Sequence, residues 1–344
     1  MIRMNEKKKF DLDLQLFATA ANTTGSNTTG NDLSTEMKTY YSAYLIDMAG
    51  PLLVHDQFGQ KHPIPKNGGK TIEFRKYTPL SKAMTALTEG VTPDGQALDV
   101  SAITATVNQY GGWIQLPDML LLSAIDNNMV QATQLLGDQA GRTLDTVTRE
   151  VLNGGTNVQY YDGSVAGRSA LTGANKLTVD CIFRAVRFLK AQNARPIDGS
   201  FVGIIHPDVA YDLMRSAEWI DLQKYTSNVD HVYNGEIGKI GGVRFVETTE
   251  AKIFAKAGAK ATAEAGSEID VYSTLILGSN AYGVTEITGG GLQHIVKQLG
   301  SSGTADPLDQ RASVGWKAVK TAERLVEQYM IRIETGSSFN SGAN

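Results

Sequence analysis

Hydrophobic positions follow a helical period over a long stretch of the chain, from residue 117 to residue 153. Apolar residues recur there at steps of three or four, which places them on one face of a helix. We therefore predict one continuous helix of about 37 residues, roughly 55 Å long. Gly137 and Gly141 lie inside it and indicate close backbone packing or a slight bend. The positions of the apolar stripe are Leu121, Ile125, Met129, Ala132, Leu136, Ala140, Leu144, Val147 and Val151.

On the N-terminal side of this helix the pattern changes to alternation. From Lys70 to Leu80, and again from Val100 to Leu116, apolar residues alternate with polar ones, which predicts two antiparallel strands. The segment between them, Ser81 to Asp99, is polar and rich in turn residues, so we predict a long hairpin with a broad tip. Two strands alone are at best marginally stable in water. The hairpin therefore needs a partner surface, supplied either by its own domain or by a neighbouring subunit.

A mixed α/β pattern follows Thr178 and predicts a compact second domain. Two stretches near the end of the chain alternate as strands and could form a sheet beneath the long helix. The predicted elements are helices from Val179 to Asn193 and from His206 to Met214, strands at Phe201 to Ile205, Gly241 to Val246 and Asp270 to Leu277, an exposed loop at Ala257 to Gly266, and terminal strands at Ser313 to Lys320 and Leu325 to Glu334.

The N-terminal residues begin with a basic, amphipathic piece from Lys7 to Ala18. The Thr-, Asn- and Gly-rich segment after it cannot bury enough apolar surface to order itself, so we expect a flexible arm. A helical pattern resumes at Leu33. The basic cluster of Lys7, Lys8 and Lys9 could contact nucleic-acid phosphates, although a solvated chain start explains it equally well.

Composition and charge remove several classes of function. The chain has 344 residues, of which 42% are hydrophobic and 20% are charged, as in ordinary globular proteins. A net charge of -4 gives no overall attraction for nucleic acid or an anionic membrane. No stretch approaches the roughly 18 apolar residues that cross a bilayer. The single Cys181 cannot close an intrachain disulfide, so we expect a soluble protein in a reducing compartment.

The sequence predicts no catalytic, metal or cofactor-binding site. Asn67 to Thr71 resembles the end of a phosphate-binding loop, but Ile64 stands where that motif needs glycine. The five histidines show no pair at helical or zinc-ligand spacing. Cys181 lies on a predicted buried helix face, and the three tryptophans are more typical of core or interface anchors than of base stacking. We therefore predict a structural protein, not an enzyme, that assembles with copies of itself.

Two local runs resemble phage coat proteins. Asp306 to Lys317 looks like a signature of the branch named after the coliphage N-four coat protein, and Phe10 to Ala18 is similar to the starts of phage coat proteins. The order of arm, hairpin, long helix, α/β domain and returning strands resembles the α+β Johnson fold of tailed-bacteriophage major capsid proteins. In that family the hairpin is the extended loop, the helix lies in the peripheral domain, and the α/β unit is the axial domain.

The resemblance implies a major capsid protein that forms the hexamers and pentamers of an icosahedral shell around double-stranded DNA. Its partners would be copies of itself and the packaged DNA, with scaffolding, portal and decoration proteins left open, and with no cofactor and no membrane. It would lie in the virion capsid after assembly in the host cytoplasm. The N-terminal arm would either be cleaved or act in place of a separate scaffold.

The resemblance also divides the chain into six parts. They are a flexible arm at 1–32, a helix and lead-in at 33–69, the extended hairpin loop at 70–116, the spine helix and peripheral domain at 117–177, the axial domain at 178–305, and peripheral strands with a C-terminal tail at 306–344. The hairpin residues that we expect to contact a neighbouring subunit are Lys70, Glu73, Arg75, Lys76, Glu89 and Asp94.

Two other functions fit the same patterns. A shell protein of a cellular nanocompartment would share the fold but enclose a protein cargo, and nucleic acid inside purified particles would argue against it. An unrelated α/β enzyme or ligand-binding protein is motivated only by the mixed pattern after Thr178. A stable monomer of 37.0 kDa at all concentrations would favour that third function.

Overall fold

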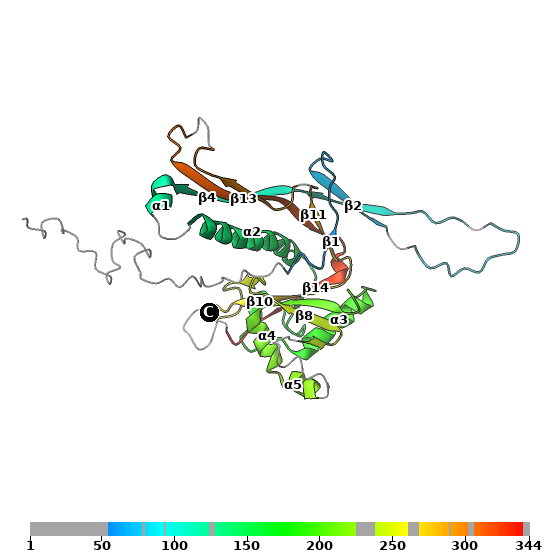
Figure 1. The fold of residues 1–344 in the computed structure, drawn as a ribbon. Helices are drawn as coiled ribbons and strands as arrows, with labels where there is room; N and C mark the ends of the chain where they lie inside the picture. Colours follow the sequence, from blue (N-terminus) through cyan, green and yellow to red (C-terminus); the bar gives the residue numbers. More distant parts are fainter. Residues whose placement is uncertain are drawn as a thin grey trace, which may run out of the picture.

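The structure is a computed structural model that describes residues 54–77, 80–92, 94–123, 128–224, 238–260, 268–288, 290–301 and 306–339. The predicted N-terminal arm with its lysine cluster, the helix expected from Leu33, and most of the loop expected at 257–266 lie outside these residues. The described chain forms a five-stranded sheet, a seven-stranded sheet and a separate two-stranded hairpin. Figure 1 shows the two sheets one above the other, with the hairpin projecting to one side.

The hairpin consists of β2 (Thr71–Tyr77) and β3 (Val100–Thr106), which pair in antiparallel register. This confirms the two antiparallel partners expected from the alternation. The second predicted strand, however, is two strands, because β3 ends at Thr106 and β4 (Asn108–Pro117) pairs with β13 in the five-stranded sheet. The inward positions change from odd-numbered residues such as Ile103 and Val107 to even-numbered ones such as Tyr110 and Ile114, so the two consecutive polar residues Asn108 and Gln109 mark the point where the chain changes partner.

In the five-stranded sheet, β13 pairs with β4 along one edge and with β11 and β12 along the other. Leu136, Ala140 and Leu144 of helix α2 are buried against Val314 and Trp316 of β13, so the central part of the predicted apolar stripe is confirmed. The remaining strands of this sheet and the helix are β1 (Gln60–Lys61), β11 (Tyr282–Glu286), β12 (Gln293–Lys297), β13 (Arg311–Arg324) and α2 (Asn128–Asn153).

The prediction of one continuous helix from 117 to 153 is wrong. Two separate helices occupy this range, α1 (Asp118–Ser123) and α2, and Pro117 still belongs to β4, where it pairs with β13 (Figure 1). None of the residues of α1 is fully buried, and the helix contacts β4. The 26 residues of α2 span about 39 Å. Close packing at Gly137 is also wrong, since a side-chain carbon there would meet no atom within 4 Å.

The seven-stranded sheet has the order β5-β14-β10-β6-β8-β7, with β9 beside β10. Helices α3, α4 and α5 lie below it in Figure 1, and apolar residues of α3 and α4 form its largest core with β10 and β14. The strands are β5 (Val158–Tyr160), β6 (Phe201–Ile205), β7 (Lys239–Ile240), β8 (Val243–Glu247), β9 (Ile253–Phe254), β10 (Val271–Leu277) and β14 (Met330–Thr335), and the helices are α3 (Val179–Ala191), α4 (Pro207–Met214) and α5 (Ala217–Lys224), with short 3-10 turns at Arg168–Ala170 and Glu327–Tyr329.

Most elements predicted after Thr178 are confirmed. α3, β6 and α4 lie where the pattern placed them, and His206 begins α4 by accepting a hydrogen bond from the backbone N–H of Asp208 at 3.2 Å. Cys181 is buried on α3, and burial raises the pKa of its thiol. The terminal stretches differ, because only β13 lies beneath α2. Every residue of β14 is buried, and the strand pairs with β10 inside the seven-stranded sheet.

Buried charge joins β14 to neighbouring segments. Glu334 of β14 is fully buried and accepts two hydrogen bonds of 2.7 Å from the guanidinium of Arg168, which raise the pKa of Arg168. Nε of Arg332 lies 2.8 Å from the same carboxylate, and Arg332 also donates to the carbonyl of Asn153 at the end of α2. One carboxylate is therefore shared by two arginines where α2 meets the seven-stranded sheet.

A second buried pair fixes the first described residues to α2. Nδ1 of His55 lies 2.6 Å from the Asp145 carboxylate, and the backbone N–H of His55 donates to the same carboxylate at 2.8 Å. The hydroxyl of Tyr282 donates to the carbonyl of His55. Asp56 next to it pairs with Lys320 of β13. This segment therefore joins α2 to β11 and β13.

The C-terminal end of the described chain is anchored to α4 through Asp212. The Ser337 hydroxyl donates to the Asp212 carboxylate at 2.8 Å, and the Ser338 backbone N–H donates at 2.7 Å. The Lys176 ammonium lies 3.5 Å from it. Burial raises the pKa of this carboxyl, but hydrogen bonds from Ser338 and Ser337 and the charge of Lys176 outweigh it, so the pKa lies below its ordinary value.

We expect this anchor to weaken at acid pH. A carboxyl whose pKa is lowered by folding stabilises the protein above its unfolded pKa of about 4, and loses that contribution as the pH falls through the folded pKa. Asp212→Asn keeps the side-chain size and removes the charge. In urea titrations, the difference in unfolding free energy between wild type and Asp212→Asn should be largest near neutral pH and should shrink below about pH 4. A difference that stays constant with pH would contradict this role.

Candidate assembly surface

The root of the hairpin rests on the five-stranded sheet. Ile72 and Phe74 of β2 alternate with exposed residues and face the body. The Phe74 ring packs edge-on against His62, with 5.5 Å between the ring centroids, and a Cβ at Gly283 would lie 3.1 Å from it. The backbone N–H of Val107 donates to the carbonyl of Lys70 at 2.9 Å. A glycine on β11 thus makes room for the aromatic ring that holds the hairpin.

The tip of the hairpin has no such support. Every described residue from 80 to 99 is exposed, and Figure 1 shows this segment extended away from both sheets. A hydrogen bond of 3.4 Å from Gln96 to the Ser81 carbonyl joins its two limbs. Exposed apolar side chains gathered in one segment are typical of an interaction surface. Those of the tip are Leu80, Met84, Leu87, Val91 and Leu98.

The charged residues expected near the hairpin root do not share one face. Glu73 and Arg75 are exposed neighbours that form an ion pair of 3.1 Å. Lys76 follows on the opposite face, the one that also carries Phe74. Lys70 directly precedes β2 and is exposed. An exposed pair contributes about 0 to 1 kcal/mol, so Glu73 and Arg75 remain available to a second molecule.

The expected tip residues Glu89 and Asp94 are both exposed and lie far along the hairpin from its root. Lys7, Lys8 and Lys9 lie outside the described residues. Sequence reasoning missed the apolar side chains of the tip, because the segment was interpreted as polar and turn-rich. Their recurrence between the polar residues, at intervals of three to seven, was the signal that could have revealed them.

A second exposed surface lies on the side of the five-stranded sheet that faces away from α2. Trp113 of β4, Gly315 of β13 and Ile295 of β12 are cross-strand partners, so they share one face. A Cβ at Gly315 would lie 2.9 Å from that of Trp113. Trp113 is 67% exposed, whereas Trp316 on the opposite face is 5% exposed and donates to Gln139 of α2. Of the three tryptophans, Trp316 and Trp219 are core residues, while Trp113 is exposed.

The described residues present exposed surfaces for contact with other molecules. Among them, no set of three or more His, Cys, Asp or Glu side chains could hold a metal ion. No helix in the described ranges is long and apolar enough to cross a membrane. The fold combines a projecting hairpin that has an exposed apolar tip, a sheet backed by a long helix, and a compact α/β unit. These features define a structural protein that presents its surfaces to other molecules.

Comparison with known families identifies this class more closely. The family of phage capsid proteins matches residues 123–299, just over half of the chain. The chain belongs to this family, and it is a phage major capsid protein, a structural component of the virion capsid and not an enzyme. No curated protein sequence matches the chain.

Solved capsid structures share the whole fold. The capsid of Ralstonia phage GP4 aligns with a TM-score of 0.68 at 16% identity, covering 93% of this chain and 100% of that one. The capsid of cyanophage P-SCSP1u aligns with a TM-score of 0.66 at 14% identity, covering 93% and 99%. The cyanophage Pam1 capsid gives 0.65 at 14%, covering 93% and 100%. These matches confirm the α+β Johnson-type capsid fold predicted from the element order.

Proposed function

We propose that this capsid protein forms hexamers and pentamers that close an icosahedral shell around the double-stranded DNA of a tailed phage. The observation that carries the proposal is the hairpin, whose tip from 80 to 99 is exposed in every described residue. The apolar side chains of this segment are not buried within their own subunit. The segment is therefore stabilised only when it packs against another molecule. The most abundant partner in a shell is the neighbouring copy.

The contact combines two kinds of interaction. Burying the apolar side chains of the tip yields about 25 cal/mol for each Å² removed from water. The charged residues of the hairpin add exposed ion pairs worth about 0 to 1 kcal/mol each, which fix geometry when repeated around a closed ring. The residues that we propose for this contact are Lys70, Glu73, Arg75, Lys76, Glu89 and Asp94, together with Leu80, Met84, Leu87, Val91 and Leu98.

The six-part division of the chain belongs to the same proposal. The five-stranded sheet with α2 fits a peripheral domain, and the seven-stranded sheet with α3 to α5 fits an axial domain. Asp306 to Lys317 supports placement in the branch named after the coliphage N-four coat protein. The proposal also includes assembly in the host cytoplasm and a contact between the lysine cluster at 7–9 and packaged DNA. Its further partners would be scaffolding, portal and decoration proteins.

Deleting Thr85 to Gly95 tests the hairpin contact. The expected result is a folded subunit, with wild-type circular dichroism and unfolding midpoint, that forms no closed shells in electron micrographs. The physical reason is that the deleted residues make no described contact with either sheet, so only contacts with other molecules are lost. Normal particles from this variant would overturn the proposed contact.

A matched replacement separates length from chemistry. Exchanging the same eleven residues for Gly and Ser keeps the reach of the loop and removes its side chains, and it should also fail to give closed shells.

Nuclease treatment followed by extraction of purified wild-type particles should recover double-stranded DNA. Particles filled with protein and free of DNA would favour a nanocompartment.

A further inference from the structure

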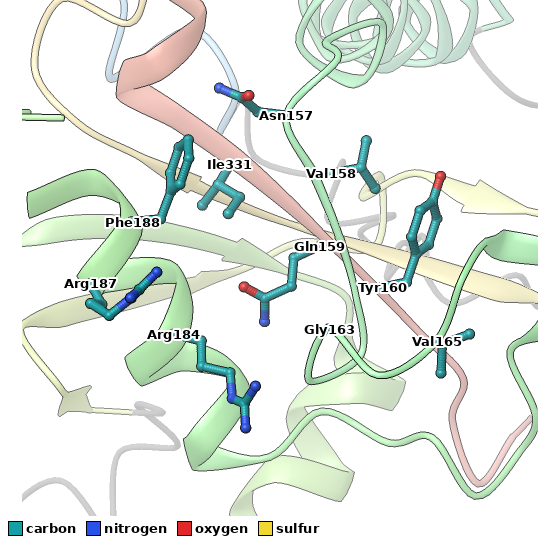
Figure 2. A pocket seen from close by; sticks show the side chains of 10 residues that line it. All are labelled: Asn157, Val158, Gln159, Tyr160, Gly163, Val165, Arg184, Arg187, Phe188 and Ile331. Atoms are coloured by element: carbon teal, nitrogen blue, oxygen red, sulfur yellow. The ribbon is translucent and has the colours of Figure 1, made fainter. Parts of the chain in front are cut away.

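A groove of about 620 Å³ opens beside β5, the edge strand of the seven-stranded sheet. Figure 2 shows Arg184, Arg187 and Phe188 of α3 on one side of it. The opposite wall is the strand from Asn157 to Tyr160, with Ile331 of β14 behind it. The hairpin contact of the proposed function does not use this groove.

The strand in this groove has one open edge. Asn157 and Tyr161 bond to β14 through their backbone groups, which leaves the backbone groups of the alternate residues, Val158 and Tyr160, pointing outward. The backbone N–H of Gly163 donates to the outward carbonyl of Tyr160, so this acceptor is already used. The remaining outward N–H and C=O groups can accept an extended segment as an additional strand.

The two faces of this edge differ in character. On the α3 face, Gln159 donates to the Cys181 carbonyl at 3.0 Å, and the guanidinium groups of Arg184 and Arg187 lie nearby (Figure 2). Arg184 shares its charge with Asp180 at 2.7 Å, whereas Arg187 forms no ion pair within the described chain. On the other face, the side chains of Val158 and Tyr160 are half-buried. The groove therefore suits a strand that is acidic on one face and apolar on the other.

Residues 10–16 of this chain have that pattern, and Phe17 follows as a further apolar residue. Phe10, Leu12, Leu14 and Leu16 alternate strictly with Asp11, Asp13 and Gln15, as in a strand with one apolar and one acidic face. We propose that residues 10–17 bind along β5 as an added strand, with the aspartates toward Arg187 and the apolar side chains beside Val158 and Tyr160. Residues 18–53 can span on the order of 100 Å when extended, so their length permits this contact.

Hydrogen exchange measured by mass spectrometry on assembled full-length protein tests the proposal. Amides of residues 10–17 and of Val158 and Tyr160 should be protected. Arg187→Glu should raise the exchange rate of residues 10–17 by about tenfold or more, because it places like charges together. Adding Asp11→Lys and Asp13→Lys to that variant should restore protection.

Lys190→Glu is the matched control, since Lys190 lies one turn farther along α3 and does not line the groove. Its exchange should equal that of wild type. The added strand would be overturned if residues 10–17 exchange freely in wild-type particles or are removed from the particles. It would also be overturned if Arg187→Glu leaves their protection unchanged, or if the amides of Val158 and Tyr160 are unprotected. Particles that form with residues 10–17 unprotected overturn this inference alone, whereas a failure to form shells counts against the proposed function.

Discussion

Replacing Glu334 with alanine should lower the free energy of unfolding of the subunit by about 3 to 5 kcal/mol. The Glu334 carboxylate is fully buried and lies against the guanidinium groups of Arg168 and Arg332. Arg332 is itself buried, so the substitution leaves a positive charge in the interior without its counterion. Breaking a buried pair on one side costs far more than the pair contributes when intact.

Urea unfolding of the unassembled subunit, followed by circular dichroism, measures this loss. Asp180→Asn provides the control, because Asp180 forms an ion pair of 2.7 Å with Arg184 in which both side chains are more than half exposed. That change should cost about 0 to 1 kcal/mol. Equal losses of unfolding free energy from the two substitutions would show that burial of the Glu334 carboxylate does not increase the cost of removing it.

The second large effect is expected at Trp316. This side chain lies between β13 and α2, packed with Leu136 and Ala140, and its indole N–H donates to Gln139 at 3.2 Å. Trp316→Ala should cost about 3 to 5 kcal/mol, because it opens a cavity that the rigid helix and sheet cannot fill. Its unfolding midpoint in urea should fall accordingly.

Trp113→Ala is the matched control from the other face of the same sheet. Trp113 lies on the adjacent strand but is 67% exposed, so its removal should change stability by less than about 1 kcal/mol. The same substitution tests whether the exposed face takes part in assembly, since it should leave the isolated subunit folded. A stability loss at Trp113 as large as that at Trp316 would contradict the assignment of the two faces.

Sequence patterns predicted those elements whose signals are local. The buried stripe of α2 follows from the spacing of Leu136, Ala140 and Leu144, and the start of α4 follows from the order of His206, Pro207 and Asp208. Each signal depends on residues within one or two turns of each other. The overall fold followed only from the order of elements and its resemblance to a capsid family.

Patterns that depend on distant partners could not be assigned in the same way. Residue 107 separates two strands that belong to different sheets; the alternation shifts by one residue just after it, but that shift does not say which strand each half pairs with. β13 and β14 likewise carry similar patterns, but β14 is buried on both faces and joins β10. α1 and α2 share apolar spacing, but α1 has no buried residue, whereas α2 buries Leu136, Ala140 and Leu144.

The hairpin that we propose as an assembly surface was predicted in part. Alternation identified the hairpin and its charged residues, and marginal two-strand stability gave the reason for a partner. It did not show that Met84 and Leu87 would stand 84% and 78% exposed, because sequence does not separate a tip that folds back from one that projects. Lys76 was grouped with Arg75 by its charge, although the pleat places the two side chains on opposite faces.

The position of Phe74 on Gly283 has a mechanical consequence. Gly283 belongs to β11, and only residues 278–281 separate β11 from β10, the strand between β14 and β6 in the other sheet. A force applied at the far end of the hairpin would therefore act on β11 through Phe74, and the short connection would pass it to β10 in the α/β unit. Subunits held by unequal neighbours would then differ in the tilt between their two sheets.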